Sequence, residues 1–261
     1  MISTLLAASL AAYIIASILY LANLHIKRKY FAAYGTAAAA IGFALQSIRL
    51  VTQAIGGVPP FANAPEAMFF LSWTIAAIYL LTFIRFRIPA LGALAMPLSL
   101  IALALVYRSP ASNGQPFAGD VWLRAHIIAI IASFALFAQA FCCAVFYLVQ
   151  NKLLKSKKFK GMFRRLPPLE TIDALGFHLV AIAFPILTLG IAAGIAGVKF
   201  AGIRAAYNAE TKLMAAGITW LVYAIYLIAH GSASWRGKRA NSILIIGAVL
   251  IALTTALHSF M

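Results

Sequence analysis

Residues 126–149 read HIIAIIASFALFAQAFCCAVFYLV, and this stretch decides the fold class. Apart from His126 it carries no ionisable side chain except two cysteines and a tyrosine, and it is longer than the roughly 20 apolar residues that a helix needs to cross a bilayer. The whole chain is 64% hydrophobic and 10% charged, with a mean hydropathy of +0.96. A water-soluble domain does not hide so much apolar surface, so the composition predicts an integral membrane protein.

Apolar runs of similar length recur along the chain and predict an all-α integral membrane protein with about eight transmembrane helices. The predicted spans are 3–25, 31–54, 65–84, 88–107, 121–150, 176–197, 211–230 and 240–260. The first span is expected to remain as a helix, because its positive cluster follows the apolar run and does not precede it. No repeat or long connection divides the sequence, so residues 1–261 are predicted to form a single polytopic membrane domain.

Basic residues predict the orientation of these spans, because short loops rich in Lys and Arg stay on the cytoplasmic side. The loops after spans 1, 3, 5 and 7 hold most of the 21 Lys and Arg residues. Both termini are therefore predicted outside, and the basic stretch 152–165 inside, in a bacterial inner (plasma) membrane. Anionic lipid headgroups account for the net charge of +16 in such loops. Membrane lipid is therefore the expected partner, and no nucleic acid is expected to bind.

Four of the five histidines fall into two pairs once the spans are oriented. His126 and His258 lie near the outer ends of spans 5 and 8, and we call them the outer pair. His178 and His230 lie near the cytoplasmic ends of spans 6 and 7 and form the inner pair. His25 ends span 1 and is interpreted as an interfacial residue. Ionisable groups in a bilayer are costly and tend to mark functional sites.

Two imidazoles on opposing helices can hold a b-type haem between them, with apolar walls over the porphyrin and cations at its propionates. The outer pair and the inner pair each predict such a site, with Arg124 or Arg49 as the outer cation. Trp73 is a candidate for lining a haem face. The alternative is that each histidine is an ordinary interfacial anchor. Five acidic residues in the chain leave no histidine–carboxylate cluster for zinc or a di-iron centre.

Several motifs, in this order and spacing, resemble the cytochrome c assembly proteins of the CcsA and HemX type, including the YpjD-like branch. The resemblance covers most of the chain from about residue 60. The similar segments are PEAMFFLSW (65–73), VWLRAHIIAIIASFALFAQA (121–140), FRRLPPLETIDALGFHLVAIAFPILTLGIAAG (163–194), ITWLVYAIYLIAH (218–230) and ALHSF (256–260). The resemblance implies that His126 and His258 are outer haem histidines and that His230 is embedded in the membrane.

One part of the family pattern is missing. Members that synthesise cytochrome c carry a WGxYWxWDPKE signature between spans 6 and 7, whereas this chain reads GIRAAYNAETKLMAAGITW at 202–220. The signature tryptophans are absent, which favours the HemX or YpjD branch over a synthase and leaves enzymatic activity uncertain.

Two functions therefore stay open. The first is a haem-binding protein that holds or translocates haem between the two faces, with a ResB-like membrane partner. The second is a HemX-like regulatory protein whose basic stretch binds a soluble haem-biosynthesis enzyme, the one that starts tetrapyrrole synthesis.

Overall fold

A computed structural model describes residues 2–26, 29–57, 63–108, 121–155, 167–200, 209–232 and 235–260. All regular structure in these ranges is helical, so the predicted all-α class is confirmed. The elements are α1 (Ile2–His25), α2 (Lys29–Ile55), α3 (Ala64–Phe86), the short 3₁₀ turn η1 (Pro89–Leu91), α4 (Gly92–Arg108), α5 (Val121–Lys155), α6 (Leu169–Phe200), α7 (Ala209–Gly231) and α8 (Lys238–Phe260).

Seven helices within the described ranges are long and apolar enough to cross a membrane. They are α1 to α7, with α4 counted together with the preceding η1 turn. The side chains of α8 are described only as far as Leu253, which leaves fewer residues than a span requires. The multi-pass membrane class is confirmed, and the eighth span and the positions of the termini stay predictions.

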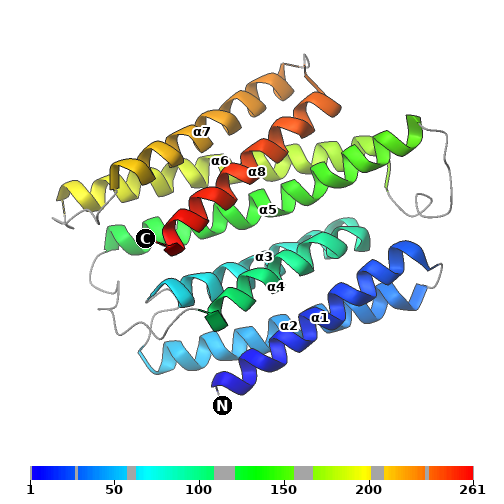
Figure 1. Cartoon of the computed structure of the whole chain (residues 1–261), viewed down its shortest axis with the longest axis horizontal. Helices are drawn as coiled ribbons and strands as arrows, with labels where there is room; N and C mark the ends of the chain where they lie inside the picture. The colour runs from blue at the N-terminus through cyan, green and yellow to red at the C-terminus, as the bar shows by residue number, and fades with distance from the viewer. Residues whose placement is uncertain are drawn as a thin grey trace. The chain divides into compact units, whose positions relative to one another are not determined.

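The chain forms two compact units. Unit 1 comprises Met1–Pro116 and Lys158–Pro167, and its described helices are α1 to α4. Unit 2 comprises Phe117–Lys157 and Pro168–Met261 and contains α5 to α8. Each unit is a group of four helices (Figure 1).

A chain of buried polar groups holds the helices of unit 1 together. The Tyr13 hydroxyl on α1 donates to Gln46 Oε1 on α2 at 2.6 Å, and Gln46 Nε2 donates to Ser72 Oγ on α3 at 3.2 Å. Ser72 Oγ in turn lies 2.9 Å from both the hydroxyl and the carbonyl oxygen of Ser99 on α4. Polar side chains in an apolar surrounding need partners, so this polar chain links all four helices.

In unit 2, α5 and α6 pack along each other and α8 packs on α5 and α7. The ring of Tyr223 on α7 stacks on Phe137 of α5, with centroids 3.8 Å apart. Neighbouring helices in this unit run in opposite directions (Figure 1). The start of α5 and the last residues of α8 therefore share one end, which we call the His126 end. The other end, where α7 finishes, is called the His230 end.

Candidate functional site

His126 lies half-buried on α5 and is bound to the neighbouring helix α6. Its Nδ1 is 2.7 Å from the carbonyl oxygen of Gly190. A carbonyl oxygen only accepts hydrogen bonds, so Nδ1 carries the proton and a neutral ring keeps its lone pair on Nε2. This is the arrangement in which metal-binding histidines are held, with one ring nitrogen fixed by a carbonyl and the other left for the metal.

Two glycines of α6 make room for this histidine. A Cβ atom at residue 194 would lie 2.7 Å from His126 Nδ1, and a Cβ at residue 190 would lie 3.1 to 3.2 Å from Ile130 and Ala129 of α5. The four-residue spacing of the glycines predicts close helix contact, and the structure confirms it. It also shows that the space at Gly194 is filled by the imidazole ring. The residues present therefore fit a neutral histidine ligand with its free nitrogen on the side away from α6.

The second histidine of the outer pair, His258, belongs to the last turns of α8. Because α8 packs on α5 in the opposite direction, the end of α8 lies at the His126 end of unit 2 (Figure 1). The side chain of His258 lies outside the part of the chain whose side chains are described. The predicted approach of the two rings therefore stays a prediction.

Arg124, the predicted outer cation on the same helix as His126, is exposed. Residues two positions apart in an α-helix point about 200° apart around its axis. The side chain of Arg124 thus leaves α5 on the side opposite to His126, and the structure does not place it beside the His126 ring. Its predicted role at a haem propionate is left as a prediction.

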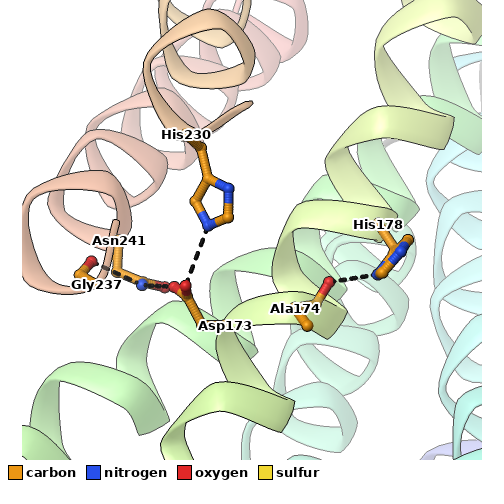
Figure 2. Close-up of polar contacts among 6 residues, drawn as sticks. All are labelled: Asp173, Ala174, His178, His230, Gly237 and Asn241. Carbon is orange, nitrogen blue, oxygen red and sulfur yellow. Dashed lines mark hydrogen bonds and ion pairs between the residues drawn. The ribbon is translucent and has the colours of Figure 1, made fainter. Parts of the chain in front are cut away.

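At the His230 end, His230 is bound to a carboxylate. Its Nε2 lies 3.1 Å from Asp173 Oδ2 on α6, and Asn241 Nδ2 on α8 donates to Asp173 Oδ1 at 2.5 Å (Figure 2). The ring of His230 stacks on Phe177 with centroids 4.6 Å apart and planes 15° apart. Three helices thus meet in one polar cluster, in which His230 and Asn241 are buried and Asp173 is partly buried, and we call it the Asp173 cluster.

His178, the other member of the inner pair, takes no part in the Asp173 cluster. It is exposed, and its Nδ1 lies 2.6 Å from the carbonyl oxygen of Ala174 in its own helix. Figure 2 shows its side chain pointing away from His230. The structure does not bring the inner pair together, and a ligand shared by the two rings stays a prediction.

Asp173 and Asn241 are the functional candidates that the sequence analysis missed. Asp173 is one of only five acidic residues and lies near the start of the apolar helix α6, where an ionisable group is costly. Its partners His230 and Asn241 are 57 and 68 residues away along the chain, so no local sequence pattern predicts these contacts. Among the described residues, no group of three or more His, Cys, Asp or Glu side chains is placed to hold a metal ion.

Arg49 and Trp73, the other predicted site residues, lie in unit 1 and have protein partners there. Arg49 is buried and forms an ion pair with Glu66 at 2.7 Å, with its guanidinium 4.0 Å from the centre of the Phe69 ring. Trp73 donates from Nε1 to Ser47 Oγ at 2.9 Å and stacks with Phe43 and Phe70. These contacts account for the positions of both side chains within unit 1. Their roles toward haem stay predictions.

Known proteins are similar to this chain over most of its length. The family described as "Cytochrome C assembly protein" matches residues 61–261. The chain is 29% identical over 203 residues to "Cytochrome c biogenesis protein CcsA" of Chlamydomonas reinhardtii, covering 74% of this chain and 56% of that protein. It is 29% identical over 218 residues to the CcsA protein of Guillardia theta, covering 75% and 71%.

A relative with another name matches nearly as well. The chain is 25% identical over 189 residues to "Protein HemX" of Brevibacillus brevis, covering 71% of this chain and 69% of that protein. The chain thus spans between about half and three quarters of the length of these relatives. Because the family match extends over residues 61–261, the resemblance noted in the motifs is confirmed and this chain belongs to the cytochrome c assembly protein family.

Proposed function

We propose that the protein binds b-type haem in the membrane and holds or translocates it between a site at the His126 end and a site at the His230 end. The observation that carries the proposal is the position of the His126 ring against α6. The carbonyl oxygen of Gly190 fixes Nδ1, and Nε2 is left for a ligand. Membership of the cytochrome c assembly family supports haem as that ligand.

At the His126 end, His126 and His258 are the residues proposed to hold the haem iron. Bound there, haem would supply an iron with two imidazole ligands and, with it, redox chemistry. The chain's own part is to fix the His126 ring between α5 and α6, with Nδ1 on the Gly190 carbonyl and the ring in the space left by Gly194. Arg124 or Arg49 is proposed to meet the propionates, and Trp73 to line a face of the ring.

At the His230 end, His178 and His230 are proposed as the inner ligands. His230 is buried and His178 is exposed, so this site needs a rearrangement that brings the two rings onto one ligand. A ResB-like membrane partner is proposed to complete the machinery, and the bacterial inner membrane is the proposed location.

A visible absorption spectrum of the purified full-length chain tests the proposal. We expect a Soret band and a low-spin bis-histidine spectrum. His126→Ala and His258→Ala should each lower the retained haem several-fold or give a high-spin spectrum, and added imidazole should restore the low-spin form. His25→Ala is the matched control, because His25 is exposed and bonded only to its own helix at Leu21. A spectrum that is unchanged in both site variants would refute the outer site.

The similarity to a HemX protein favours a second candidate function. In this alternative the basic stretch 152–165 binds a soluble enzyme of haem biosynthesis and regulates it, and the membrane domain is an anchor. A colourless chain that retains such an enzyme on an affinity column, and loses it when the basic residues are replaced, would support this alternative.

A further inference from the structure

The Asp173 cluster holds His230 by the nitrogen that haem iron would need. Asp173 carries the only carboxylate that the described residues place against this ring. A carboxylate oxygen accepts, so the proton of the His230 ring sits on Nε2 and points at Asp173. On the other ring nitrogen, Nδ1, the neighbouring Cβ obstructs a flat porphyrin whose iron must come within about 2 Å. Asp173 and haem iron therefore compete for Nε2.

The cluster is built to keep that hydrogen bond. Asn241 is completely buried, and its Nδ2 donates both to Asp173 at 2.5 Å and to the carbonyl oxygen of Gly237 at 2.9 Å. His230 is only 7% exposed, and its ring is stacked on Phe177. A carboxylate in such a place is costly to leave without donors, so Asp173 retains His230 firmly.

We propose that Asp173 is the resting partner of His230 and that the inner histidine binds haem only by exchanging this carboxylate for iron. The inference rests on the proposed function, because it takes haem as the ligand of His230. The exchange is neutral: Nδ1 takes up one proton and Nε2 releases one, and an iron–nitrogen bond replaces the hydrogen bond. Asp173 thereby lowers the affinity of the inner site for haem and keeps His230 Nε2 occupied until haem replaces the hydrogen bond.

Haemin titration of the full-length chain tests this exchange. The parent variant is His126→Ala, which removes the outer site, and the Soret band is followed as haemin is added. Asp173→Asn keeps the size of the side chain and removes its charge, and we expect it to raise the haemin affinity about tenfold, the weight of one hydrogen bond to a charged group. Adding His230→Ala should abolish the gain.

Two further variants show whether the effect belongs to the hydrogen bond. Glu170→Gln removes the same charge from an exposed position one turn earlier in α6, and it should leave the affinity unchanged. Asn241→Ala removes the other donor to Asp173, so the carboxylate becomes costlier to separate from His230, and the haemin affinity should fall below that of the parent. In the haem-free chain with ¹⁵N-labelled histidine, Asp173→Asn should shift the NMR signal of His230 Nε2 and leave that of His25 in place.

The outcomes separate the inference from the proposed function. An Asp173→Asn affinity equal to or below that of the parent, or a gain that survives His230→Ala, overturns the inference. If the unmodified chain binds haemin through His126 but Asp173→Asn gives no gain, only the inference fails. If the unmodified chain and all variants bind no haemin, the proposed function fails with it.

Discussion

The imidazole of His126 occupies the space that any side chain at residue 194 would need, since a Cβ there would lie 2.7 Å from its Nδ1. This contact joins α5 to α6 and fixes the ring whose Nε2 is left for a ligand. Glycine at 194 is thus part of the candidate site although it has no side chain to offer.

Gly194→Ala is expected to displace His126 from its seat. The added methyl group must push the ring away from Gly190, because backbone surrounds it on the α6 side. Haemin affinity should fall about tenfold or more, with a loss in stability of about 1–3 kcal/mol from overpacking. A Soret titration and a thermal unfolding curve measure the two effects. Gly217→Ala is the control, since nothing lies within 4 Å of a Cβ there. Equal losses of haemin affinity in the two variants would mean that the position of the His126 ring against Gly194 does not affect haemin binding.

Arg49→Met is expected to destabilise the protein by about 3–5 kcal/mol, because it leaves the carboxylate of Glu66 buried without its ion-pair partner. Arg49→Met combined with Glu66→Leu should recover most of that loss, which a double-mutant cycle of unfolding free energies measures. If the single variant is as stable as the original chain but loses haem, Arg49 acts on the propionates and the ion pair is incidental.

Arg124→Gln is expected to weaken haemin binding by less than tenfold, because an exposed ion pair is worth about 0–1 kcal/mol. The loss should shrink further at high salt, and Arg124→Lys should retain most of the affinity. Arg85→Gln, at an exposed position in unit 1, controls for the change in total charge. An Arg124→Gln chain that binds haemin as the original does would exclude this residue from the site.

A reporter that is active only outside the cytoplasm should work when fused at residue 261. This follows from the basic residues in alternate loops, and a cytoplasmic reporter at the same place should be silent. A fusion after residue 155, beyond Lys152 and Lys155 at the end of α5, should give the opposite result. Reversed activities would place the His126 end in the cytoplasm and reverse the two proposed sites.

The sequence predicts what depends on distance along a helix and fails on what depends on direction around it. Span lengths follow from apolar runs, and the expected depth of His126 follows from its place near the start of α5. His178 and His230 were matched by depth alone. His178 is five residues after Asp173, which turns it about 140° around α6 and away from the cluster that Asp173 forms with His230.

Contacts between distant segments were equally out of reach. The bond from His126 to Gly190 joins residues 64 positions apart, and only the close packing of α5 and α6 creates it. The spacing of Gly190 and Gly194 did indicate a close approach, but not that a functional ring fills part of it. Asp173 was noticed only as one of a few acidic residues, because its two donors come from α7 and α8.

The polar chain of unit 1 also makes the last helix of that unit a partner of the other three. Ser99 on α4 supplies both the hydroxyl and the carbonyl oxygen that Ser72 on α3 meets, and α4 is the last of these four helices to leave the ribosome. Until it enters the bilayer, Ser72 lacks these partners and the chain from Tyr13 through Gln46 ends on an open hydroxyl. The bonds from Tyr13 to Gln46 and from Gln46 to Ser72 join α1, α2 and α3, and α4 supplies the partners that complete the chain at Ser72.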